Sequence, residues 1–547
     1  MKEKPDVLVV IPARGGSKSI PRKNLRSLNG KPLISYAIET ALEIKHNPDI
    51  YVSSEDEEIL YIAAQFGAKV IVREKSLAAD NTTLDPVVYE AFIRAQQLEG
   101  KVYDLIVTLQ PTSPLLQSSS INDAIGRMIA NPDIDTVISA SDDTHLTWKI
   151  ENGKYVPNFK KRVNRQYLQP IFRETGGFLI TRPSVITPAS RIGKKVDLYL
   201  LSGGEEIDID TLEDWSLCEY YLKRKKILFV VSGNRQIGLG HVHNTLLVAN
   251  DILDHQVSFL VDKTSQLAYQ KIMEYNYPVF FQKYEDIVED IKKINPDVVI
   301  NDRLDTTSHY IRAIKETGKK VVNFEDLGEG ARLADLVINA IYPEQEALPN
   351  HYFGPEFFIL RDEFIFSPQK TVSEKVKNVL VTFGGVDAQN LTCKVVDAIY
   401  NYCNEKGIQI NVVVGLGYED LESLEHFSGV KVFRNVKTMA SYMLEADIVF
   451  TSAGRTIYEV ASIATPAIVM AQNAREMTHF FASPEYGFLN LGLGAHVSKQ
   501  TIIENFKRLT DSKQTRERMH ALMKQYDLRS GRKRVNQLIR RVLEGSS

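Results

Sequence analysis

The stretch VLVVIPARGGSKSIPRKN, residues 7–24, joins an apolar, largely β-branched run to a loop that holds two adjacent glycines and four cations but no carboxylate. Such a run predicts a buried strand. Ligands of open α/β sheets bind beyond the carboxyl ends of the strands, so a phosphate-bearing ligand is favoured at this loop. The glycines let the backbone approach closely, and the cations Arg14, Lys18, Arg22 and Lys23 neutralise phosphate oxygens. From this loop alone, a solvated basic turn is the alternative.

Strand-like runs alternate with segments of helical period along the rest of the first 226 residues. This alternation is typical of βαβ units around a parallel sheet. Residues 143–190 are polar, aromatic and less periodic, which indicates an inserted lid or dimerisation arm. A helical segment that ends in KRKK, residues 223–226, closes the unit.

The same alternation restarts twice, at ILFVVSG, residues 227–233, and at NVLVTFGG, residues 378–385. The polar segment 367–377 separates the two sets of strands. We therefore expect an α/β protein with a Rossmann-like domain over residues 1–225. Two Rossmann-like halves, 226–367 and 368–547, follow it as two lobes that face a cleft.

The composition excludes several classes of protein. Hydrophobic residues make up 44% and charged residues 25% of the chain, as in ordinary globular proteins. A formal charge of -3 gives no general attraction for nucleic acid or an anionic membrane. The three cysteines are scattered without metal-ligand spacing, as in reduced cytosolic proteins. No apolar run reaches roughly 18 residues and no apolar signal core is visible, so we expect a cytoplasmic protein with no membrane partner.

Two aspartates lie two positions apart in EIDIDT, residues 206–211. In a strand, Asp208 and Asp210 share one face, and Ile207 and Ile209 share the other. Two carboxylates of this kind can bind Mg²⁺ or Mn²⁺ together with the phosphates of a substrate. A solvated strand edge explains the pair equally well in isolation, but the cationic loop in the same unit favours a metal and nucleotide site.

Four motifs in residues 6–222 together resemble the acylneuraminate cytidylyltransferases, also called CMP-sialic acid synthetases. They are IPARGGSKSIPRKN (11–24), LQPTSPLL (109–116), FRETGGFLIT (172–181) and IDIDT (207–211). The resemblance implies a Rossmann-like nucleotidyltransferase that converts CTP and a nine-carbon 2-keto sugar acid to a CMP-sugar and pyrophosphate. It also implies that Asp208 and Asp210 hold the metal ion.

The resemblance further implies roles for individual residues. Arg14 and Lys23 would stabilise the charge that develops on the phosphates. The expected CTP-binding residues are Arg14, Gly15, Ser17, Lys18, Arg22, Lys23, Asn24, Arg73 and Gln110. The expected sugar-acid-binding residues are Gln110, Lys149, Arg173 and Thr175.

Three positions depart from the family's pattern: Leu116 where many members carry Arg, Thr175 where Asn is common, and Ser19 where Gly is common. N-acetylneuraminate, legionaminate and pseudaminate therefore remain alternative substrates. The 143–190 insertion resembles the family's dimer arm, so we expect a homodimer or a higher homo-oligomer.

A glycine turn opens the second unit in QIGLGHVHN, residues 236–244. Gly238 and Gly240 permit a tight turn before an amphipathic helix, and His241 falls at the helix N-terminus. The helix dipole there disfavours imidazolium, so His241 is a candidate general base, with a capping or packing histidine as the alternative. Further small-residue turns that suit a diphosphate contain Gly384, Gly385, Ser452 and Gly454. Glu459 could accept from ribose hydroxyls.

Residues 227–500 resemble the two-lobed GT-B nucleotide-sugar enzymes, most closely the UDP-sugar hydrolase of the pseudaminic acid pathway. The resemblance implies that the later lobe holds UDP, with Asn473 among its ligands, and that His241 activates water to release a free 2,4-diacetamido-trideoxyhexose. Asp302, Asn323 and Asp326 are expected to line the cleft from the earlier lobe.

Two departures weigh against a working hydrolase. Asn244 replaces an Arg that is usual in the family's Gly-His-x-x-Arg pattern, and VSGNRQ, residues 231–236, lacks the usual acidic residue. We expect a bifunctional enzyme of nonulosonic acid biosynthesis. The alternatives are a cytidylyltransferase with a non-catalytic GT-B-like binding or assembly module, or with a glycosyltransferase unit.

Overall fold

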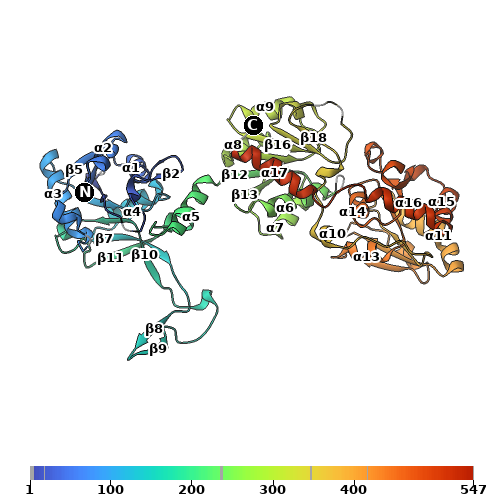
Figure 1. The fold of residues 1–547 in the computed structure, drawn as a ribbon, viewed down its shortest axis with the longest axis horizontal. Coiled ribbons are helices and arrows are strands. Elements are labelled where there is room, and N and C mark those ends of the chain that lie inside the picture. The colour runs from blue at the N-terminus through green and yellow to red at the C-terminus, as the bar shows by residue number, and fades with distance from the viewer. Residues whose placement is uncertain are drawn as a thin grey trace. The chain divides into compact units, whose positions relative to one another are not determined.

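A computed structural model describes residues 5–17, 19–79, 81–234, 238–344, 346, 348–415 and 417–545. The chain divides into two compact units, Met1–Arg224 and Lys225–Ser547, and each is described by itself (Figure 1). Among the described residues, no helix has the length and apolar character needed to cross a membrane.

The first unit is built on a seven-stranded sheet in the order β11-β7-β10-β6-β1-β4-β5. The strand β1 pairs parallel with β4 and β6, whereas β10 pairs antiparallel with β6 and β7. The strands of this sheet are β1 (Val7–Pro12), β4 (Asp49–Ser54), β5 (Lys69–Val72), β6 (Leu105–Leu109), β7 (Thr136–Asp142), β10 (Phe172–Thr181) and β11 (Val196–Leu200).

Helices cover both faces of this sheet, which explains why the β1 sequence is a continuous apolar run. Alternate β1 residues pack into one core with α1, α2 and α4, and the others pack into a second core with α3. The helices are α1 (Leu33–Leu42), α2 (Glu57–Gln65), α3 (Leu84–Glu99), α4 (Ser118–Ala130) and α5 (Leu212–Lys223).

The inserted segment forms a hairpin of β8 (Trp148–Glu151) and β9 (Lys154–Pro157), which projects from the sheet between β7 and β10 (Figure 1). A second short hairpin joins β2 (Ser27–Leu28) to β3 (Lys31–Pro32). The prediction of a strand at 206–211 is wrong. Gly203–Glu206 forms a 3₁₀ helix, and the residues between it and the start of α5 belong to no strand. Ile209 is nevertheless fully buried, because it packs with Trp215 of α5.

The second unit contains two separate parallel sheets, as the sequence predicted. The earlier lobe has the order β14-β13-β12-β15-β16-β17-β18 and the later lobe β21-β20-β19-β22-β23-β24. The earlier strands are β12 (Lys226–Val231), β13 (Gln256–Val261), β14 (Val279–Phe281), β15 (Val298–Asp302), β16 (Lys320–Phe324), β17 (Leu336–Asn339) and β18 (His351–Phe353). The later strands are β19 (Asn378–Val381), β20 (Gln409–Val414), β21 (Lys431–Arg434), β22 (Ile448–Thr451), β23 (Ala467–Ala471) and β24 (Phe488–Leu493).

The two lobes of this unit are joined by shared packing. The C-terminal helix α17 packs into the core of the earlier lobe (Figure 1). Tyr458 stacks on Phe358 with ring centroids 4.0 Å apart and donates a hydrogen bond to the Ala340 carbonyl at 2.6 Å. The helices of the earlier lobe are α6 (Gly240–Asp251), α7 (Gln266–Met273), α8 (Ile287–Ile294) and α9 (Ser308–Lys315). The later ones are α10 (Asp362–Phe366), α11 (Leu391–Lys406), α12 (Glu422–Glu425), α13 (Met439–Glu445), α14 (Thr456–Ile463), α15 (Lys499–Asp511), α16 (Lys513–Met523) and α17 (Gly531–Glu544).

Candidate functional site

The basic loop of the first unit follows β1, and acidic residues after β4 contact it. The Gly15 amide donates to Glu55 Oε1 at 2.7 Å, and the Arg22 guanidinium bonds the Glu58 carboxylate. Asn24 donates to the Arg14 carbonyl at 2.9 Å, which holds the loop against the short helix at Lys23–Leu25. Ser17 is partly exposed in this loop, and Lys18 lies outside the described residues.

The structure brings the loop to the aspartate pair across more than 180 residues of sequence. Lys23 Nζ donates to the Ile209 carbonyl at 2.6 Å and lies 3.4 Å from Asp210 Oδ1. Burial, reinforced by Asp210, raises the pKa of Asp208. The predicted cationic and acidic groups therefore form one local site.

Asp208 and the central glutamine motif meet at β10. A β-carbon built on Gly176, which has a φ of +73°, would lie 2.8 Å from Asp208 Oδ2 and 3.0 Å from Gln110 Nε2. Asp208 Oδ1 is buried without a hydrogen-bond partner. This orphaned oxygen, with the nearby exposed Asp210, fits a divalent cation that takes its remaining ligands from phosphates. Among the described residues, no cluster of three or more His, Cys, Asp or Glu side chains forms a metal site.

Arg73 contacts Glu55, the residue that bonds the basic loop. Its Nη2 donates to the Ser53 carbonyl at 2.7 Å, and its guanidinium lies 3.7 Å from the Glu55 carboxylate. Burial lowers the pKa of Arg73. Arg73 therefore supports the loop through Glu55, a residue that the sequence reasoning missed although it directly follows a predicted strand.

The residues expected to bind the sugar acid are more dispersed. Lys149 lies on β8 of the projecting hairpin and pairs with Glu151 at 2.6 Å, and Arg173 is exposed near the start of β10. The Thr175 hydroxyl is buried and hydrogen-bonded to Ser139 Oγ at 2.8 Å. Of this set, Gln110 is the residue that the structure brings to Asp208.

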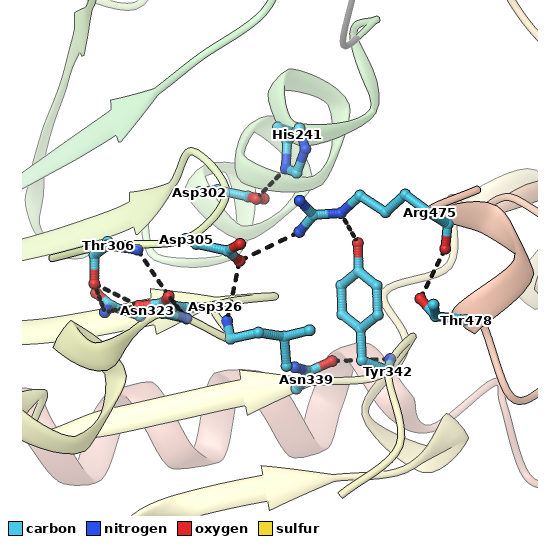
Figure 2. A network of polar contacts seen from close by, with 12 residues as sticks. His241, Asp302, Asp305, Thr306, Asn323, Asp326, Asn339, Tyr342, Arg475 and Thr478 are labelled. Atoms are coloured by element: carbon cyan, nitrogen blue, oxygen red, sulfur yellow. Dashed lines mark hydrogen bonds and ion pairs between the residues drawn. The ribbon is translucent and has the colours of Figure 1, made fainter. Parts of the chain in front are cut away.

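A histidine and an aspartate form the centre of the candidate site in the second unit (Figure 2). The helix α6 begins at Gly240, and His241 Nδ1 in its first turn bonds Asp302 Oδ1 at the end of β15. A carboxylate only accepts, so Nδ1 carries a proton, and Nε2 is the nitrogen on which the neutral ring holds its lone pair. Asn244 Nδ2 donates to the other Asp302 oxygen at 2.8 Å. His241 is thus held as a base would be.

The prediction that Asn323 and Asp326 line the cleft is wrong. Their side chains are buried, and Asp326 accepts from Asn323 at 2.6 Å and from the Thr306 hydroxyl at 2.6 Å (Figure 2). They hold together the loops that follow β15 and β16.

Arg475 of the later lobe contacts two residues of the earlier lobe. It bonds the Tyr342 hydroxyl and lies 3.3 Å from Asp305 Oδ1 (Figure 2). His479 lies near it, with its ring 5.1 Å from the Tyr342 ring. His479 Nδ1 donates to the Ala453 carbonyl at 2.7 Å, and burial lowers the pKa of the ring to about 4. Neither residue was predicted from the sequence.

The expected nucleotide-sugar residues gather at the ends of later-lobe strands. Gly384, with a φ of +83°, and Gly385 follow β19 with open space beside both. Ser452 and Gly454 follow β22, and a β-carbon on Gly454 would lie 3.2 Å from Glu476 Oε1. Asn473 accepts from the Glu476 amide at 3.0 Å.

Two further positions complete this description. Glu459 accepts a hydrogen bond from Arg361 Nε at 2.9 Å, and burial raises the pKa of Glu459. In the glycine turn of the earlier lobe, Gly238 has a φ of +75°, and the residues between Asn234 and Gly238 lie outside the described part of the chain.

Comparison with known proteins identifies the first unit. Residues 8–173 match the protein family described as Cytidylyltransferase. The pseudaminic acid cytidylyltransferase of Campylobacter jejuni subsp. jejuni serotype O:2 is 44% identical over 41% of this chain and 97% of its own length. The chain belongs to the cytidylyltransferase family. The predicted enzyme class and α/β fold are confirmed.

The second unit of this cytidylyltransferase also matches a family: residues 378–530 match the Glycosyltransferase family 28 C-terminal domain. A Helicobacter pylori protein named pseudaminic acid cytidylyltransferase and UDP-2,4-diacetamido-2,4,6-trideoxy-beta-L-altropyranose hydrolase is 22% identical over 92% of this chain and 94% of that protein. An uncharacterized protein of Methanocaldococcus jannaschii is 32% identical over 45% of this chain, and the match spans 56% of that protein's length.

Proposed function

We propose that the first unit transfers CMP from CTP to a nonulosonic acid of the pseudaminic or legionaminic type, and that the second unit hydrolyses a UDP-2,4-diacetamido-trideoxyhexose. The match to the Campylobacter relative over 97% of its length carries the first assignment. The match to the bifunctional Helicobacter protein over 92% of this chain, together with the His241–Asp302 pair, supports the second.

In the first reaction the anomeric hydroxyl of the sugar acid attacks the α-phosphorus in line, and pyrophosphate leaves. Lys23 and Arg14 stabilise the charge on the phosphate oxygens, and Gln110 positions the reactants beside Asp208. The Gly15 amide, which bonds Glu55 here, turns to a phosphate oxygen when CTP is bound. Asp208 and Asp210 would hold a Mg²⁺ ion, which would neutralise charge on the phosphates.

In the second reaction His241 Nε2 takes a proton from water as the water oxygen attacks the anomeric carbon. The bond between that carbon and the β-phosphate oxygen breaks, and UDP leaves. Asp302 holds the ring and stabilises the imidazolium that forms, so free sugar and UDP are the products. The turns at Gly384 and Ser452–Gly454 supply backbone amides to the diphosphate.

The projecting hairpin supports an assembly of at least two chains. Trp148, Ile150 and Tyr155 on it are 56%, 66% and 78% exposed. Burying them against a second copy would remove apolar surface from water and bring Lys149 into a more enclosed setting. CTP and UDP-sugars are cytoplasmic metabolites, so we place the enzyme in the cytoplasm.

A substrate panel with three variants tests both assignments. CTP is offered with pseudaminate, legionaminate and N-acetylneuraminate, and UDP release is measured from UDP-diacetamido sugars. Arg14→Ala or Asp210→Ala is expected to abolish CMP-sugar formation and to leave UDP release intact. His241→Ala is expected to lower UDP release by about 10²–10⁴-fold, the usual contribution of a general base, and to spare CMP transfer.

The panel also separates the two assignments. A wild-type protein that forms a CMP-sugar but binds UDP-sugars without releasing UDP would replace the hydrolase by a non-catalytic binding module. If the protein forms no CMP-sugar from any of the three acids, the first assignment is refuted.

A further inference from the structure

An arginine of the later lobe reaches the His241 helix of the earlier lobe. Arg455 directly follows Gly454 in the turn after β22 and precedes α14. Its Nη2 donates to Asn244 Oδ1 on α6 at 2.9 Å, over 211 positions of sequence. The side chain is 24% exposed and its guanidinium lies 5.2 Å from the centre of the Phe358 ring. The contact is therefore partly desolvated.

This contact fixes the orientation of the Asn244 amide. An arginine only donates, so the amide oxygen of Asn244 faces Arg455, and the amide nitrogen is left to donate to Asp302. Asn244 is 3% and Asp302 0% exposed, so water does not compete for these groups. A continuous chain of bonds runs from Arg455 through Asn244 and Asp302 to His241.

A buried acid faces the same guanidinium. Glu325 Oε1 lies 3.9 Å from Arg455 Nη1, and Glu325 Oε2 is buried without a partner. Glu325 directly follows β16 and has a φ of +52°, a left-handed conformation that a non-glycine residue rarely adopts. A β-carbon on Gly240 would lie 3.2 Å from Arg455 Cδ, so the turn before His241 also packs closely on this arginine.

We propose that Arg455 is a positioning residue for the hydrolase reaction, which orients Asn244 and through it the Asp302–His241 pair, and which ties that pair to the diphosphate turn Ser452–Gly454. The inference rests on the proposed hydrolase function. It also gives the departure at Asn244 a physical meaning: the cation expected there from α6 is supplied by the opposite lobe, so the asparagine does not argue against catalysis.

The test compares kcat and KM for UDP release in Arg455→Met, Asn244→Leu and the double variant. Each single change is expected to lower kcat by about 10–100-fold, since a misplacement of 1 Å can cost that much, while KM and the Kd for UDP change by less than about 3-fold. Arg455→Lys should recover part of kcat. The double variant should be no slower than the slower single variant, because both changes break the same chain of bonds.

Two controls make the test specific. Arg508→Met removes the same charge from the exposed face of α15 and should leave both kcat and KM unchanged. An unchanged Kd for UDP and an unchanged Tm of the second unit report that this unit is folded in each variant, because CMP transfer is assigned to the first unit.

Three outcomes would overturn the inference: a KM or UDP Kd raised at least 10-fold with kcat kept, losses that multiply in the double variant, or an unchanged kcat in Arg455→Met. A wild-type protein that releases no UDP refutes the proposed function and the inference together, whereas an active wild type with an unaffected Arg455→Met refutes the inference alone.

Discussion

Replacing Glu325 by glutamine should make the second unit more stable at alkaline pH but not at acid pH. Burial raises the pKa of Glu325 from its ordinary value of 4.5 to about 7, although Arg455 acts in the opposite direction. The unfolded chain therefore releases this proton before the folded protein does as the pH rises. The contribution to stability is fully present below about pH 4.5 and is lost as the pH rises through about 7. A glutamine stays neutral and avoids this loss.

The magnitude follows from the size of the shift. A change of about 2.5 pKa units at 1.36 kcal/mol per unit gives a full penalty of about 3 kcal/mol, of which about 2.5 kcal/mol develops between pH 5 and pH 8. Unfolding of a unit of about 320 residues has an entropy of about 0.7 kcal/mol/K, at about 2.1 cal/mol/K per residue. The gain in Tm from Glu325→Gln should therefore be about 4 °C larger at pH 8 than at pH 5.

Calorimetry measures this difference, and fluorescence assigns the transitions. Both tryptophans, Trp148 and Trp215, lie in the first unit, so the unfolding transition without a tryptophan signal belongs to the second unit. Glu405→Gln, an exposed change on α11 with the same loss of charge, is the matched control and should show no such pH dependence. An equal shift at both pH values, or a lower Tm at pH 8, would refute the reasoning.

Two further substitutions test the packing of each unit. Gly176→Ala places a methyl group against Asp208 and Gln110 in a left-handed conformation that costs about 1–2 kcal/mol; CMP transfer should fall at least about 10-fold with UDP release unchanged, and an unaffected rate would show that this close approach is not needed. Tyr458→Phe removes the buried hydrogen bond to the Ala340 carbonyl and should lower the stability of the second unit by about 1 kcal/mol in the same calorimetric assay; an unchanged Tm would mean that this bond contributes nothing net.

The sheets could be predicted because each buried strand carries its own signal. Residues 7–11 are apolar on both faces since helices cover both, and the later parallel strands β12 and β23 show the same buried apolar pattern. The strands β5 and β21 at the edges of their sheets are largely exposed and lack it. The alternation in EIDIDT gave a misleading signal: a 3₁₀ helix precedes Ile207, and tertiary packing against α5 buries Ile209 without a strand. A period of two over five residues does not distinguish a strand from an extended segment that packs on a helix.

Some site residues are marked by the sequence next to them, whereas others are defined by contacts with residues far away in the sequence. His241 and the loop cations were predictable, because a turn of glycines or a strand end marks them locally. Glu325 directly follows a strand and Arg455 follows a small-residue turn, but these local signals do not show what either side chain contacts. His479 carries no such signal. Arg455 meets Asn244 only because the two lobes close against each other, and a single sequence holds no information on which side chains face across that interface.

The contacts that build the two sites stay within separate units. Lys23 meets the aspartate segment within residues 1–224, and Arg455 meets Asn244 within residues 225–547. The contacts described for each site therefore join residues of one unit only. Selective loss of one activity is then the expected result for each variant above that changes a site residue. A variant of Lys23 that slowed UDP release in proportion to CMP transfer would require a coupling between the units that the bonds inside them do not supply.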